Sequence, residues 1–115
     1  MSEGTLIRPL TWGEMKVFRN TTGATTATVT FSGTSRFAAL VTTVKPAILT
    51  DYGGLYAVFG YGTSAAARRV ETLVSAAEIT ITPTTGGFTV TASTATYFTI
   101  VVPIDLNDTA SVVFS

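Results

Sequence analysis

The sequence predicts an all-β domain, an antiparallel β-sandwich or jelly roll of about eight or nine strands. Short runs of alternating apolar and polar residues follow one another along the chain, separated by Gly, Asn, Asp or Pro. Threonine, whose β-branched side chain suits the solvent face of a strand, is the commonest residue. We expect the 115 residues to form one domain, with residues 1–20 as an amino-terminal arm or a first strand.

The first runs predict strands with clear faces. In TATVTF, Ala27, Val29 and Phe31 share one face and threonines make the other. The run RFAALVTTV is apolar on both faces, which predicts a central and buried strand. It is followed by Pro46 and by turn residues at 51–54. The next run, LYAVFGY, places four residues together on one face: Leu55, Ala57, Phe59 and Tyr61.

Residues 77–92, AEITITPTTGGFTVTA, predict a hairpin. Its apolar face comprises Ile79, Ile81, Phe88, Val90 and Ala92. The pair Gly86-Gly87 is expected to supply the positive φ that a tight reversal requires. The opposite face comprises Thr80, Thr82, Thr89 and Thr91. Because covering threonines desolvates no charge, we expect any neighbouring molecule to sit on this threonine face.

The carboxy-terminal part predicts two further strands. TYFTIVVPIDL aligns Phe98, Ile100, Val102, Ile104 and Leu106 on one face. Asn107-Asp108 then turns the chain into ASVVFS, and we expect this last run to pack in its own sandwich or at a subunit interface. We expect a single core that contains Ile81, Phe88, Val90, Phe98, Ile100 and Val102.

Residues 63–78 fit two structures. Val70, Leu73, Val74 and Ala77 fall at helical spacing, and the segment is rich in alanine. Alternation across residues 69–74 instead fits a strand. We favour the strand because the neighbouring runs are all strands, and the helix stays an alternative.

Composition excludes several kinds of chemistry. The chain has neither His nor Cys, which removes a Ser-His-Asp triad, a Cys nucleophile and thiolate metal sites. Seven basic and seven acidic residues cancel, and only 12% of residues are charged, so no electrostatic footprint for nucleic acid or an anionic membrane is expected. The low charge and threonine-rich surface favour oligomerisation. Neither a signal peptide nor a transmembrane segment is recognisable.

Three short motifs could indicate ligand sites, but for each of them we prefer a purely structural explanation. GYGTSA at residues 60–65 matches a variant of the dinucleotide fingerprint, but no alternation of strands and helices surrounds it. Asp105 and Asp108 offer oxygen ligands for Ca²⁺, yet a turn explains them as well. Arg68-Arg69 lies among alanines instead of base-stacking aromatics, and its expected partner is Glu71 or an acidic group on a neighbouring strand. We therefore nominate no catalytic, cofactor-binding or metal-ligating residue, and we expect no cofactor.

Most of the chain after Thr25 has a recognisable sequence pattern. The pattern is found in SGTSRFAALVTTV, in GGLYAVFGYGTS, in the hairpin strands AEITIT and FTVT, and in the final YFTIVV. In these runs the chain resembles small Thr/Gly/Ala-rich β-sandwich modules of bacteriophage structural proteins, of the head-fibre or tail-fibre tip type. The resemblance implies a non-enzymatic virion or surface component, often a homotrimer. No residue-level motif is matched, so no functional residue is carried over.

We therefore expect a non-enzymatic structural or adhesive β module, a phage or prophage virion component that assembles as a homo-oligomer, with a trimer favoured. Other virion proteins or a cell-surface glycan are further expected partners, whereas nucleic acid and membrane insertion are not expected. The alternative is a carbohydrate-binding module that uses surface aromatic rings. The candidate rings are Tyr52, Tyr56, Tyr61, Tyr97 and Trp12. An enzyme ranks third.

Overall fold

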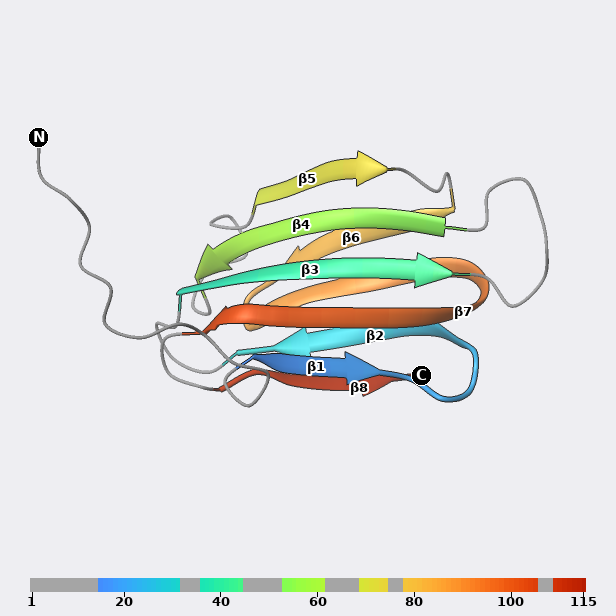
Figure 1. The fold of residues 1–115 in the computed structure, drawn as a ribbon, viewed down its shortest axis with the longest axis horizontal. Coiled ribbons are helices and arrows are strands. Elements are labelled where there is room, and N and C mark those ends of the chain that lie inside the picture. The colour runs from blue at the N-terminus through green and yellow to red at the C-terminus, as the bar shows by residue number, and fades with distance from the viewer. Residues whose placement is uncertain (1–14, 32–35, 45–52, 62–68, 75–77, 106–108) are drawn as a thin grey trace, which may run out of the picture.

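The structure, a computed structural model, describes residues 15–31, 36–44, 53–61, 69–74, 78–105 and 109–115. All of its regular elements are β-strands, and every strand pairing is antiparallel (Figure 1). The strands are β1 (Lys16–Arg19), β2 (Ala24–Thr30), β3 (Arg36–Val44), β4 (Gly53–Tyr61), β5 (Arg69–Val74), β6 (Ile79–Thr84), β7 (Gly87–Asp105) and β8 (Ser111–Phe114). The predicted all-β class and antiparallel pairing are confirmed. Within 1–20, residues 16–19 form a strand, and residues 1–14 lie outside the described part.

Strand β7 takes part in two ladders. Its first half pairs with β6 and β2, and β8 continues this four-strand ladder beside β2. Its second half pairs with β3 and β1, and β4 and β5 continue this five-strand ladder beyond β3. All eight strands are consequently joined in one hydrogen-bonded sheet that turns at β7. In Figure 1 the five-strand ladder lies nearer the viewer, and β6 passes behind β3 and β4. A jelly-roll topology stays a prediction.

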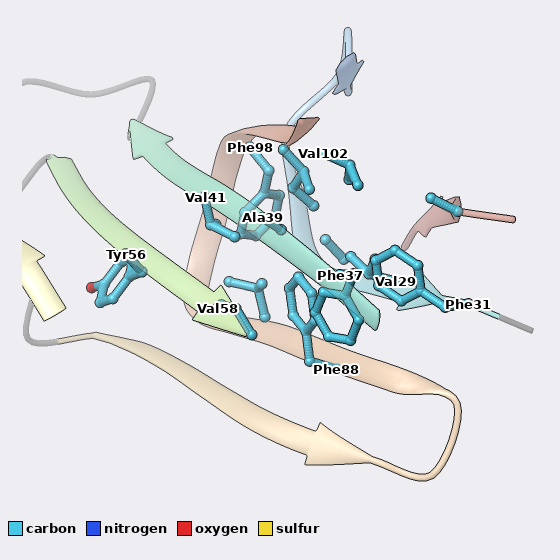
Figure 2. Packing of buried hydrophobic residues seen from close by; sticks show 14 of the residues in the cluster. Val29, Phe31, Phe37, Ala39, Val41, Tyr56, Val58, Phe88, Phe98 and Val102 are labelled. Atoms are coloured by element: carbon cyan, nitrogen blue, oxygen red, sulfur yellow. The ribbon is translucent and has the colours of Figure 1, made fainter. Parts of the chain in front are cut away.

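One core fills the space between the two ladders (Figure 2). Phe37 of β3 stacks on Phe31, which follows β2, with ring centroids 3.9 Å apart, and on Phe88 of β7, at 5.9 Å. At the other end Phe98 stacks on Phe114 of β8, at 6.2 Å. These contacts hold the ladders face to face, because each pair joins a residue of the five-strand ladder to one of the four-strand ladder.

The predicted core is confirmed. Phe88, Val90, Phe98, Ile100 and Val102 are buried, and Ile81 is a partly buried residue that packs against them. The predicted inner face of β2 is also confirmed, since three of its predicted residues are buried: Ala27, Val29 and Phe31. The side chains of Ile104 and Tyr61 and all of Leu106 lie outside the described part.

The second face of β3 departs from the prediction. β3 is central, as expected, between β4 and β7. Only its inner face is buried, however, and on the outer face Leu40 is 41% exposed and Val44 is 50% exposed. In β4, Tyr56 and Val58 point into the core, so the predicted face that contains Leu55 and Phe59 is the outer one. In β3, therefore, one of the two apolar faces lies in the core and the other faces away from it.

Two further local differences concern β5 and β7. Residues 69–74 form a strand, so the helix alternative is wrong for that stretch, whereas residues 62–68 and 75–77 lie outside the described part. The runs that we treated as separate strands, up to Ala92 and from Thr96, are one strand of 19 residues. The connecting residues Ser93-Thr94-Ala95 include no Gly, Pro, Asn or Asp that would end a strand.

The hairpin of β6 and β7 has the predicted register, with Ile81 opposite Val90 and Thr82 opposite Thr89. The expected role of its glycines is wrong, since neither Gly86 nor Gly87 has a φ in the left-handed region. Gly87 is required by packing instead. A Cβ at Gly87 would lie 2.0 Å from the carbonyl oxygen of Val29 in the paired strand β2.

We expect Gly87→Ala to destabilise the protein strongly, because the methyl group meets backbone that cannot move without breaking the β2–β7 ladder. Gly86→Ala is the matched control: its Cβ would be 3.4 Å from the Thr30 methyl group, an ordinary contact. Denaturant unfolding should show a loss of about 3 kcal/mol or more for Gly87→Ala and less than about 0.5 kcal/mol for Gly86→Ala. Equal effects would refute the packing explanation.

Phe98→Ala should remove about 3–5 kcal/mol of stability, because it leaves a cavity between the two ladders where Phe98 is fully buried against Phe114. That loss is most of what a small domain has. Thermal unfolding followed by circular dichroism measures it. An unchanged melting temperature would show that Phe98 does not belong to the core.

Candidate functional site

The crossing point of β7 is held by a buried side chain outside the strand. The β2–β7 register shifts between the pairs Ala24↔Thr96 and Thr26↔Thr91, so β7 carries extra residues there as a bulge. Thr96 is buried, although the residues before it, Ser93 to Ala95, are exposed. Bulges bend a strand and increase its twist, which lets β7 leave one ladder and enter the other.

Asn20, between β1 and β2, satisfies the backbone at this bend. Its Nδ2 donates hydrogen bonds to the carbonyl oxygens of Thr96 (2.9 Å) and Thr22 (2.8 Å), and its Oδ1 accepts one from the Phe98 backbone N–H (2.7 Å). The residue is only 8% exposed. A buried carbonyl or N–H without a partner is costly, so this one amide stabilises both the β1–β2 turn and the bend.

The same turn borders an open hollow of about 380 Å³. It is lined by Arg19 to Ala24 on one side and by Phe114 and Ser115 on the other. The amide of Asn20 is engaged inside the fold. The polar side chains left to meet a ligand are those of exposed Arg19, Thr21, Thr22 and Ser115. These groups offer one cation and three hydroxyls, which fit polar contact and provide no activated nucleophile.

The two ladders present unlike outer faces to solvent. On the four-strand ladder, threonines of β2, β6 and β7 cover the outer face, and Thr28 lies between Thr89 and Val113. On the five-strand ladder, large apolar side chains stand on the outer face of all five strands. These are Val17, Tyr97, Leu40, Val44, Phe59 and Val74, each between 38% and 60% exposed. An exposed apolar surface of this extent is unusual on a monomer.

The structure describes only part of each of the three predicted motifs. Gly60 and Tyr61 end β4, and the rest of the GYGTSA motif lies outside the described residues. Asp105 ends β7, and Asp108 is outside the described part, as is Arg68. Arg69 forms an exposed ion pair with Glu71, as predicted. The described residues include no group of three or more His, Cys, Asp or Glu side chains that would hold a metal ion.

The two tyrosines whose side chains are described do not share a surface. Tyr56 is 4% exposed and belongs to the core, so the alternative of a sugar-stacking surface does not hold for this residue. Tyr97 is 38% exposed on the outer face of the five-strand ladder. Tyr52, Trp12 and the Tyr61 side chain lie outside the described part. Over the ranges that the structure describes, no segment is a helix of the length and hydropathy needed to cross a membrane.

Sequence reasoning missed Asn20. It assigned no role to this residue, whereas the amide nitrogen is committed to two hydrogen bonds in the fold. The available signal is a short polar residue followed by Thr-Thr-Gly between two strand-like runs. That pattern indicates a turn, but it does not reveal a partner 76 positions away in the chain.

Comparisons with known proteins return little. No family model matches the chain, and no curated protein matches it. Among solved structures, the crystal structure of the Acinetobacter phage vB_ApiP_P1 tailspike protein is similar, with 12% sequence identity and a TM-score of 0.45. The match covers 100% of this chain and 25% of that chain, so the chain spans a quarter of the tailspike's length. A likeness of this degree carries no argument about function.

Asn20→Ala should cost about 2–4 kcal/mol, because it leaves the Thr96 carbonyl and the Phe98 N–H buried without partners. Asn20→Asp keeps the acceptor for Phe98 but loses both donors and places a charge in a buried site, so it should be at least as harmful. Thr22→Ala is the control, since only its backbone carbonyl is used. Urea unfolding compares the three, and a tolerated Asn20→Ala would refute the anchoring role.

Proposed function

We propose that this chain is a non-enzymatic structural or adhesive β module, a virion component of a phage or prophage, that assembles as a homo-oligomer. The observation that carries the assembly half is the apolar outer face of the five-strand ladder. Water contact with such a face is unfavourable, at roughly 25 cal/mol for each Å² of apolar surface, and association with another copy removes it. A trimer is the favoured assembly, on the basis of the sequence resemblance to phage fibre-tip modules.

The non-enzymatic half is supported by residue chemistry. The chain has no His and no Cys, and its few acidic residues are scattered. Among the described residues, neither outer face places a nucleophile beside a general base, the arrangement that covalent catalysis requires. Structural and adhesive modules instead need a rigid framework with distinctive surfaces, which the Asn20 anchor and the two unlike faces supply. Other virion proteins or a cell-surface glycan are the proposed partners of the surfaces that assembly leaves free.

Sedimentation velocity of the purified chain over a dilution series at micromolar concentrations tests the assembly half. We expect a particle heavier than the 12.0 kDa chain at the upper end, at three times that mass if the trimer is correct. The apolar outer face supplies the physical reason, since association removes it from water.

A single species of 12.0 kDa at every concentration would remove the assembly half of the proposal. For the adhesive half, binding to an array of cell-surface glycans is the measurement. If the protein binds no glycan on the array, the adhesive half of the proposal fails and a purely structural module remains.

A further inference from the structure

We propose that a second copy of this chain docks on the outer face of the five-strand ladder, with Leu40 at the centre of the contact. This inference rests on the proposed assembly and deepens it by naming the surface. It differs from our expectation from the sequence, which placed a neighbour on the threonine face of the other ladder. Two properties favour the five-strand ladder over the threonine face, apolar content and area, and a third, the lack of charge at its centre in the described residues, permits its burial.

The apolar residues of the five-strand ladder form a connected surface. Leu40 of β3 lies between Val101 of β7 and Ala57 of β4, which is only 8% exposed, and Val101 in turn pairs with Val17 of β1. Phe59, one strand over, pairs with Ala38 and is the diagonal neighbour of Leu40 on the same face. The register therefore places apolar side chains side by side across four strands, which is the pattern of an interface core.

In the described part of the chain, the charged residues of this face stand at its margins. Arg69 and Glu71 stand on the edge strand β5 and already form an ion pair with each other. Arg19 ends β1 at the opposite edge, and Arg36 begins β3. The outer positions between these margins on β3, β4 and β7 carry no charge in the described residues. A second copy would therefore bury the centre without desolvating an ion, while the marginal charges stay in water.

The areas of the two faces differ as well. With a rise of about 3.3 Å per residue and a strand spacing of about 4.8 Å, the five-strand ladder presents about 600 Å² in projection and the four-strand ladder about 400 Å². Side chains raise the accessible area above the projected one. A standard interface takes about 800 Å² from each partner, and only the larger face approaches this value.

Matched charge insertions separate the two faces. Leu40→Lys with Phe59→Lys places two like charges at the centre of the proposed contact, and Thr80→Lys with Thr89→Lys places the same charge on the threonine face. We expect sedimentation to show the first variant as a 12.0 kDa monomer and the second with the mass of the wild type. Circular dichroism confirms that each variant is folded. If the first variant does not fold, Leu40→Thr with Phe59→Thr keeps strand propensity and tests the same loss of apolar contact.

A chemical probe tests the contact without charge. Because the chain has no cysteine, Leu40→Cys and Thr82→Cys each introduce a single thiol, on the five-strand ladder and on the threonine face respectively. With a maleimide reagent, we expect Leu40→Cys to react at least ten-fold more slowly at the concentration of full assembly than at high dilution. Thr82→Cys should react equally fast under both conditions.

Three outcomes overturn the inference. If the threonine-face lysines dissociate the assembly and the Leu40 and Phe59 variants do not, the contact is on the other ladder and the proposed function survives. If neither pair changes the mass, the contact lies elsewhere in the chain. If the wild type is monomeric at every concentration, the assembly half of the proposed function fails together with the inference.

Discussion

The amide of Asn20 is the interaction on which the fold depends most directly. It pairs with the backbone on both sides of Tyr97, at the point where β7 leaves β2 and joins β3. Without this amide, two buried backbone groups lose their partners where the strand is bent by extra residues. Gly23 packs against the same bend, because a Cβ there would lie 2.9 Å from the Cβ of Ala95. The β1–β2 turn and the bend of β7 therefore fit together as one unit.

The bend has consequences for both surfaces of the molecule. Because β7 continues from one ladder into the other, the inner faces meet in a single core and the outer faces point apart. Successive side chains along each strand then alternate between the core and the outside, so the outward-pointing residues determine the composition of each outer face. On β2, β6 and the first half of β7 these residues are threonines, and on β3 and β4 many are large and apolar. The molecule consequently has one hydroxyl-rich face and one apolar face.

Much of the framework was predictable, because strand faces depend on local alternation. The hairpin of β6 and β7, the inner face of β2 and the core around Phe98 and Ile100 follow from that rule. The strand at 69–74 was harder to predict, since the helical and strand patterns overlap there. The exposed face of β3 was missed because an apolar run on two faces does not say whether a second layer covers both.

The anchor and the glycine contact lay beyond sequence reasoning for a different reason. Asn20 contacts Thr96, and Gly87 contacts Val29, across distances in the chain that no local pattern encodes. A turn-forming Asn and a hairpin Gly have local explanations that are sufficient by themselves. The candidate assembly face, similarly, is a property of five strands together and is not visible in any one of them.

The central claim is that the apolar face of the five-strand ladder becomes covered when copies of the chain meet, and methyl NMR with a soluble paramagnetic probe tests it in the unmodified protein. Leu40 and Val113 are both exposed methyl-bearing residues, at 41% and 65%, on opposite ladders. Because Val113 serves as the internal reference, no substitution is needed. The account predicts that, as protein concentration rises, the probe's relaxation effect falls at Leu40 and persists at Val113. A fall in the probe's relaxation effect at Val113 with no change at Leu40, or no change at either residue, would contradict the account.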